Sequence, residues 1–279
     1  LVAGIPVASI GPSIASIYGR ALDLRRCAAI AISQSGKSPD IVRMAQSAKD
    51  SGAYTIALTN TPGAPLATAA DVSIDLHAGE EKSVAATKSF VNSVVAGLAI
   101  LAHATESGEL LRALARLPSS IETAISRDWS ALVGGLDGRS SLYVLGRGPS
   151  FAVAQEAALK FKETCGLHAE AYSAAEVLHG PARIVEAGFP VIGLTADEDA
   201  GESSVVEVVD RLAGQGARAF VTSDLAKAAT ALPATNTGEP LTAALALIVS
   251  FYAFAESYSR HRGFDPDHPP HLKKVTETL

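Results

Sequence analysis

Residues 27–39 read C-A-A-I-A-I-S-Q-S-G-K-S-P, an apolar run that passes directly into a polar loop. The run at 27–33 predicts a central parallel strand covered on both faces, because such strands are apolar almost throughout. Pro39 suits the first position of a helix, and the apolar residues after it recur at helical spacing until Gly52. Residues 54–58 predict the next strand, so this segment is expected to form a strand–helix–strand unit.

The second half of the chain repeats this plan. A strand is predicted at 191–194, a helix at about 203–213 and another strand at 217–222, with a further strand at 142–145. Strands that alternate with helices are typical of α/β folds with open, mostly parallel sheets. We therefore expect two lobes, each a three-layer arrangement of one mostly parallel sheet flanked by helices.

Composition excludes several classes of protein. The 29 acidic and 23 basic residues give a net charge of −6 with no basic block, which argues against a nucleic-acid partner. The most apolar stretch, residues 241–255, is shorter than the roughly 20 residues needed to span a bilayer, so it predicts a buried helix.

Cys27 and Cys165 lie in segments expected to be buried and lack disulfide or metal spacing, which fits a reducing cytoplasm. Because the chain starts at Leu1 and its one methionine is Met44, an N-terminal piece is expected to be missing.

The loop S-Q-S-G-K-S at 33–38 lies where the first strand gives way to a helix. A helix N-terminus carries unpaired N–H donors and a partial positive charge, and hydroxyl groups add neutral donors, so a phosphate monoester suits this position. The spacing matches neither a Walker nor a Rossmann loop. The alternative is a polar turn in which Ser38 only caps the helix.

A second segment, E-E-K-S-V-A-A-T-K at 80–88, enters the apolar helix expected at 89–103. It could face the serine loop, or it could be an ordinary helix start.

Three residues of the second half, Glu156, Lys160 and Glu163, share one face of a predicted helix. They could form a solvated salt-bridge stripe, but the apolar residues around them favour partial burial, which can poise a carboxylate to carry a proton. His179 precedes Gly180-Pro181 at a predicted turn and could face a cavity, or it could be a scaffold residue. His168 and His179 are too far apart for a helical zinc pair, so no metal site is expected.

Five motifs, taken in order, make the chain resemble the SIS (sugar isomerase) family, and within it the isomerase domain of glutamine–fructose-6-phosphate transaminases and the stand-alone glucosamine-6-phosphate deaminases. The motifs are A-I-S-Q-S-G-K-S at 31–38, S-V-A-A-T-K-S-F at 83–90, L-G-R-G to E-A-A-L-K-F-K-E between 145 and 163, H-A-E-A-Y-S-A-A-E-V-L-H-G-P at 168–181 and D-P-D-H-P-P-H-L-K-K-V-T at 265–276. This resemblance implies a first SIS domain at 1–115, a second at 116–262 and a tail at 263–279 that closes the active site.

The resemblance also implies roles for individual residues. The sugar phosphate would be held by Ser33, Gln34, Ser35 and Ser38, with Val84 and Ala86 lining the opposite wall. Glu163 would move a proton between C1 and C2, with Lys160 and Glu156 as its partners on the helix. His179, supplied by the neighbouring subunit, would open the sugar ring, and Lys274 would form an imine with the open-chain ketose.

Some positions depart from the family pattern. Ala86 and Pro270 stand where the family usually has serine and arginine. The family's first strand and its Gly/Ser loop are expected to lie before Leu1. The acidic loop at 195–199 would repel phosphate, so one site per subunit is expected, built mainly on the first lobe.

No glutaminase segment is visible in these residues. The first hypothesis is therefore a glucosamine-6-phosphate deaminase that releases ammonia and yields fructose 6-phosphate without a metal or redox cofactor. An aldose–ketose isomerase of a related phosphosugar and a non-enzymatic sugar-phosphate sensor are the alternatives. The apolar helices at 89–103 and 241–255 predict a homodimer. The cysteine usage predicts a cytoplasmic location, and the resemblance implies that the two subunits share active sites.

Overall fold

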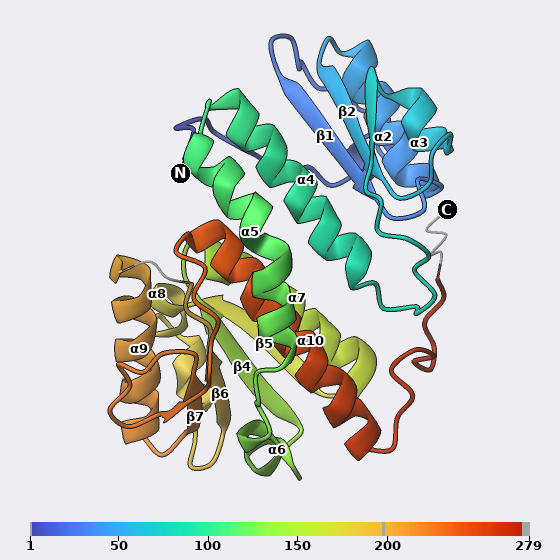
Figure 1. Cartoon of the computed structure of the whole chain (residues 1–279). Coiled ribbons are helices and arrows are strands. Elements are labelled where there is room, and N and C mark those ends of the chain that lie inside the picture. The colour runs from blue at the N-terminus through green and yellow to red at the C-terminus, as the bar shows by residue number, and fades with distance from the viewer. Residues whose placement is uncertain (1, 197–198, 275–279) are drawn as a thin grey trace. The chain divides into compact units, whose positions relative to one another are not determined.

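The structure, a computed structural model, describes residues 2–196 and 199–274 of the 279-residue chain. Two compact units make up the chain (Figure 1). Unit 1 takes in the residues up to Ser107 together with those described from His271 onwards, and unit 2 is Gly108–Pro270. Residues 275–279 of the predicted tail and residues 197 and 198 of the acidic loop lie outside the described part.

Unit 1 is built on a parallel sheet of order β1-β2-β3. Helices α2 and α3 cover one face of this sheet, where Ala45 and Leu66 pack against Ala57. The predicted strand–helix–strand unit is therefore present. Its elements are α1 (Ser13–Ser16), β1 (Ala28–Ser33), α2 (Pro39–Asp50), β2 (Tyr54–Thr59), α3 (Pro65–Ala69), β3 (Val72–Asp75) and α4 (Lys88–Ala104).

The position of β1 differs from the prediction of a central, doubly covered strand. Within the described residues β1 pairs with β2 alone, so it is an edge strand. Its side chains alternate in exposure, and Ile30 and Ile32 are 48% and 50% exposed on the face opposite α2. Cys27, just before β1, is also exposed rather than buried, whereas Cys165 is buried as expected. An apolar run shows that a strand can be buried, but the number of neighbouring strands decides whether it is.

Unit 2 carries a parallel sheet of order β5-β4-β6-β7-β8, so β4, β6 and β7 each have two neighbours. The strands predicted at 142–145, 191–194 and 217–222 are β4, β6 and β7. The elements are α5 (Gly108–Ile125), α6 (Ala131–Leu136), β4 (Ser141–Gly146), α7 (Pro149–Cys165), β5 (His168–Ser173), α8 (Ala174–Val177), a 3-10 turn (Pro181–Ile184), β6 (Pro190–Gly193), α9 (Asp199–Gly214), β7 (Arg218–Val221), β8 (Thr230–Ala231) and α10 (Pro240–His261).

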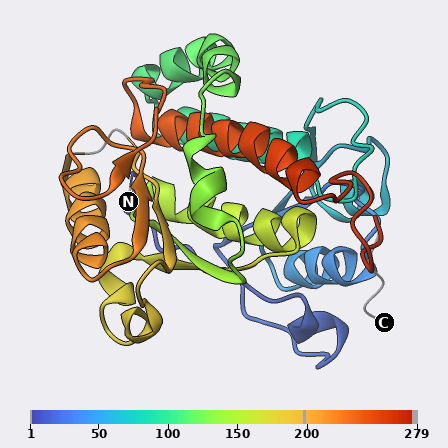
Figure 2. The same ribbon diagram turned by 90° about the horizontal axis from the view of Figure 1, so that it is seen from below.

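Helices cover both faces of the unit 2 sheet. Tyr143 and Leu145 pack with residues of α8 and α9, and side chains alternate along a strand, so Leu142 and Val144 face the other way. Helix α7 contacts β4 and β5, and α10 runs alongside α7 (Figure 2). The sheets and flanking helices confirm the predicted α/β class.

Helix α10 contains the apolar stretch predicted as a buried helix and extends beyond it to His261. By length and composition α10 could cross a membrane, but 67% of its apolar window is buried inside the structure. This burial is typical of the core helix of a folded domain.

The turn that connects β1 to α2 depends on Gly36. This residue has φ +62°, and a Cβ atom there would lie 2.6 Å from Ala64 Cβ and 2.8 Å from Thr59 Oγ1. Because Thr59 is fully buried at the end of β2, the neighbouring atoms have little room to move. Glycine is therefore required where the serine loop crosses β2.

We expect Gly36→Ala to lower the free energy of unfolding by about 2–4 kcal/mol, since it adds a left-handed backbone penalty and a steric clash. Urea unfolding measures the loss. Gly63→Ala is the matched control, because Gly63 has φ +72° with nothing within 4 Å of the added Cβ. That control should lose about 1 kcal/mol. Equal losses in the two variants would show that the clash is absent.

Candidate active site

The serine loop joins the carboxyl end of β1 to the N-terminus of α2. Ser33 Oγ accepts the Gly36 N–H at 3.2 Å, and Ser35 Oγ accepts the Lys37 N–H at 3.3 Å. Because each hydroxyl accepts a bond, its own hydrogen can still be donated to a ligand. The side chains of Ser33 and Ser35 are half-buried and can be reached from solvent.

Ser38 occupies the N-cap position of α2, but its side chain makes no capping hydrogen bond. Its side chain therefore does not cap the helix, and phosphate binding by this loop stays a prediction. Its half-buried hydroxyl lies at the positive end of a 12-residue helix and is not used by that helix. This arrangement suits an anionic group.

Asn60 ties the serine loop to the segment that precedes α4, a role that the sequence did not reveal. Its N–H donates to Gln34 O at 3.1 Å, and its side-chain amide donates to Gly79 O at 2.6 Å. Its side-chain oxygen accepts the Ala78 N–H at 2.8 Å. Asn60 follows β2 directly, so it holds loops from neighbouring strand ends together.

Glu81 is the second residue that sequence reasoning missed. It is buried, and its carboxylate accepts the Ser89 N–H at 2.7 Å and the Thr87 N–H at 3.3 Å. A carboxylate at a helix N-terminus satisfies donors that the helix leaves unpaired and interacts favourably with its dipole. An acidic residue shortly before an apolar helix was the available signal.

Lys274 lies against this same segment. Its Nζ donates a hydrogen bond to the Ser83 carbonyl, next to the half-buried Val84 and Ala86. The tail lysine and the 83–86 segment thus meet in unit 1, which also holds the serine loop.

In unit 2, α7 carries a buried ionic cluster. Lys160 Nζ lies 3.2 Å from Glu156 Oε1 and 2.5 Å from Glu163 Oε2. The side chains of Lys160 and Glu156 are only 6% and 8% exposed, while Glu163 is 24% exposed. The alternative of a solvated stripe is therefore wrong, and the predicted partial burial is confirmed.

The environment of Glu156 favours its neutral form more than water does. Burial raises the pKa of Glu156, and the Lys160 charge and a hydrogen bond from Tyr252 oppose that rise. Glu163 is the carboxylate at the more exposed end of the cluster. A carboxylate so placed, bonded to an ammonium group, can exchange protons with a bound molecule.

His179 lies in an exposed turn between α8 and the following 3-10 turn, where its N–H donates to Glu176 O at 3.0 Å. Within the described residues, no hydrogen bond or ion pair joins its ring to Glu156, Lys160 or Glu163.

The structure thus holds the predicted residues in two groups. Unit 1 has Ser33, Gln34, Ser35, Ser38, Val84, Ala86 and Lys274, and unit 2 has Glu156, Lys160, Glu163 and His179.

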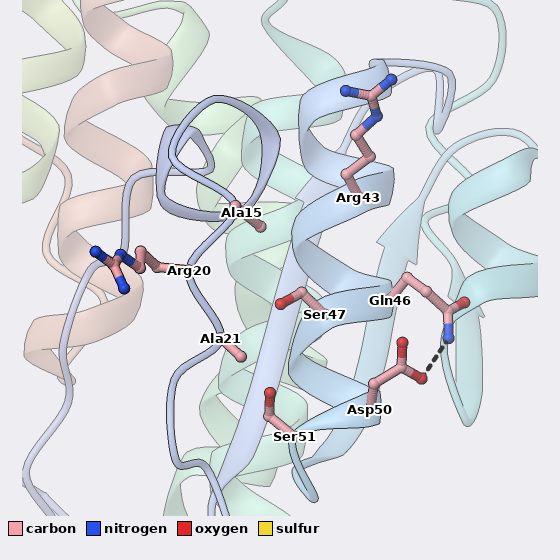
Figure 3. Close-up of a pocket in the computed structure, with 9 residues that line it drawn as sticks. Ala15, Arg20, Ala21, Arg43, Gln46, Ser47, Asp50 and Ser51 are labelled. Atoms are coloured by element: carbon pink, nitrogen blue, oxygen red, sulfur yellow. Dashed lines mark hydrogen bonds between the residues drawn. The ribbon is translucent and has the colours of Figure 1, made fainter.

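Unit 1 also has an open pocket of about 420 Å³ along the second half of α2 (Figure 3). Its lining includes Arg20, Arg43 and Asp50, and Gln46 donates to Asp50 at 2.9 Å. It contains none of the predicted site residues.

Comparison with known proteins identifies the family. The SIS domain matches residues 24–103 and 136–256, which is most of the chain. This chain belongs to the SIS domain family. Both units of this SIS protein contain a matched region.

Individual relatives give closer comparisons. A solved structure from Silicibacter pomeroyi DSS-3, provisionally assigned as a phosphosugar isomerase, is 51% identical with a TM-score of 0.91, covering 95% of this chain and 81% of that one. The glutamine–fructose-6-phosphate aminotransferase of Pyrobaculum aerophilum is 36% identical over 95% of this chain, but the match spans only 46% of that relative. The glucosamine-6-phosphate deaminase of Thermotoga maritima is 20% identical with a TM-score of 0.75, covering 95% of this chain and 80% of that one, which shows a shared fold.

We expect Lys160→Met to lower the free energy of unfolding by about 3 kcal/mol, because it leaves a carboxylate buried without its cation. Urea unfolding at neutral pH measures this. Lys162→Met, at an exposed position of the same helix, should change stability by less than about 0.5 kcal/mol. Adding Glu156→Gln to Lys160→Met should recover part of the loss. Equal stability of the two lysine variants would contradict the buried ion pair.

Proposed function

We propose that this SIS protein deaminates glucosamine 6-phosphate to fructose 6-phosphate and ammonia. The observation that carries the proposal is the buried cluster on α7, in which Lys160 holds the more exposed Glu163 at 2.5 Å. Such a carboxylate can move a proton between adjacent carbon atoms of a bound sugar. The relatives named as an aminotransferase of fructose 6-phosphate and a deaminase of glucosamine 6-phosphate support this substrate class.

The phosphate group is assigned to the serine loop. Ser33, Gln34, Ser35 and Ser38 would surround it at the N-terminus of α2, where hydroxyl hydrogens and the helix dipole favour a dianion. Val84 and Ala86 would line the opposite wall.

The reaction then proceeds through the residues of the second group and Lys274. His179, supplied by a second subunit, opens the ring to the free aldehyde. Glu163 removes the proton from C2 and returns it to C1, while the amino nitrogen loses a proton and O1 gains one, so that C2 becomes an imine and C1 an alcohol. Water adds to C2 and ammonia leaves, which yields the ketose. Lys274 Nζ can hold the open-chain ketose as an imine, and its neighbour Ser83 positions it.

An aldose–ketose isomerase is the second candidate. The 51% identical structure from Silicibacter pomeroyi, provisionally assigned as a phosphosugar isomerase, favours it. The same Glu163 would move the same proton, but with a hydroxyl group at C2 no ammonia would leave.

The proposal includes a cytoplasmic homodimer. The shared site requires a second subunit to supply His179. Helix α4, apolar along its length and half-buried over most of its residues, offers surface for such an association, whereas α10 is largely buried inside the structure.

We expect incubation with glucosamine 6-phosphate to release ammonia and fructose 6-phosphate in equal amounts. A coupled glutamate dehydrogenase assay measures ammonia. Interconversion of glucose 6-phosphate and fructose 6-phosphate without ammonia from the aminosugar would favour the isomerase instead.

We expect Glu163→Gln to lower kcat by at least about 100-fold, since general acid–base catalysis contributes about that much or more, while calorimetric affinity for the substrate changes little. Glu207→Gln, at an exposed position of α9, is the matched control and should retain full activity. Full turnover by Glu163→Gln would refute its role.

A further inference from the structure

Tyr252 reaches the ionic cluster from α10, the helix that packs alongside α7. Its hydroxyl donates to Glu156 Oε1 at 2.7 Å. This is the same oxygen atom that lies 3.2 Å from Lys160 Nζ. The cluster is therefore a continuous chain of contacts from Tyr252 through Glu156 and Lys160 to Glu163.

A neutral O–H donor favours the ionised form of a carboxylate, because the charged oxygen is the stronger acceptor. Burial acts in the opposite direction on Glu156. Within the cluster, Lys160 also favours the carboxylate, while the Glu163 charge disfavours it. The Tyr252 bond and the Lys160 charge thus oppose burial and the charge of Glu163.

The other elements packed against α7 direct their titratable groups elsewhere. On β4 and β5, each such side chain has a partner outside the cluster: Tyr143 donates to Pro181 O, His168 bonds to Ser141 Oγ, and Tyr172 donates to Glu170. On α10, Glu256 bonds to Arg260, and His261 bonds to Asp137. Tyr252 is thus the α10 group bonded to Glu156.

We propose that Tyr252 is a positioning residue whose hydroxyl stabilises the carboxylate form of Glu156 and so favours the placement of Lys160 between Glu156 and Glu163. Without that hydroxyl, Glu156 takes up a proton at higher pH. A neutral Glu156 attracts Lys160 less, and the ammonium group then depends on Glu163 alone. The effect on turnover rests on the function proposed above, but the effect on Glu156 does not.

The first test titrates Glu156 directly in the full chain labelled with ¹³C at glutamate carboxyl carbons, with the signal assigned by its loss in Glu156→Gln. Tyr252→Phe removes a hydrogen bond to a charged group, which is a substantial interaction. It should therefore raise the pH at the midpoint of the Glu156 titration by about one unit. Tyr258→Phe is the matched control: it removes the hydroxyl of another buried α10 tyrosine, whose pKa is raised by burial and affected by Arg262 and Asp137 and not by the residues of the cluster. Its Glu156 midpoint should match the wild type.

An unchanged midpoint in Tyr252→Phe, or an equal movement in both variants, would overturn the proposal. If Tyr252→Phe does not fold, Tyr252→Gln and Tyr252→Leu give the same comparison, because only glutamine retains a donor. A midpoint no higher in the leucine variant than in the glutamine variant would overturn it as well.

The second test follows turnover. In the pH profile of kcat/KM, the fall in activity at low pH should move to higher pH in Tyr252→Phe, by the same amount as the titration midpoint of Glu156. It should stay in place in Tyr258→Phe. A fall in activity that stays in place in Tyr252→Phe while the Glu156 midpoint moves would overturn the link to Lys160. A wild-type protein inactive on every phosphosugar would refute the proposed function instead, and the NMR titration would still decide the role of Tyr252.

Discussion

Parallel pairing is the constraint on which both units depend. It brings the carboxyl ends of neighbouring strands to the same edge of a sheet, where each chain must turn into a helix. The turns are tight enough to require glycine: a Cβ on Gly36 would meet Ala64 and Thr59, and one on Gly146 would lie 2.6 Å from Ser150 O. Both turns place a polar loop at the start of a helix, the serine loop before α2 and the Arg147–Ser150 turn before α7. The two polar loops thus lie where the backbone has the least freedom.

Local sequence was sufficient to predict the strands β1, β2, β4, β6 and β7, but it missed β3, β5 and β8 and did not show which strands lie side by side. The run at 27–33 and the segment that forms β4 are both apolar, and each was correctly identified as a strand. In the structure β4 lies between β5 and β6, while β1 pairs with β2 alone, so similar composition leads to full burial in one and to exposed Ile30 and Ile32 in the other. Composition reports what a strand can bury. Which strands lie beside it is decided by contacts distant in sequence.

In the candidate site, too, local features could be predicted from the sequence, whereas contacts between distant residues could not. The spacing of Glu156, Lys160 and Glu163 placed them on one helical face, because that geometry is local. Tyr252 is 96 residues from Glu156, and Lys274 is 191 residues from Ser83, so neither contact could be predicted from spacing. Asn60 was missed for the same reason, since its partners come from the ends of two other segments. Glu81 is different: it lies eight residues before Ser89, within reach of a local argument from helix capping.

The energetics of the α7 cluster favour the role in proton transfer proposed above over a role in stability. Two carboxylates share one ammonium group among buried side chains, and desolvation of such charges commonly costs more than their attraction returns. Apolar residues of similar volume would pack between α7 and α10 at lower cost. Burial is deepest at Glu156 and Lys160 and least at Glu163, so the cost falls on the two residues that hold the third in place. A desolvated support beneath one more exposed carboxylate is what the proposed proton transfer to a bound sugar would require, because the carboxylate must meet the carbon atom without first rearranging its own partners.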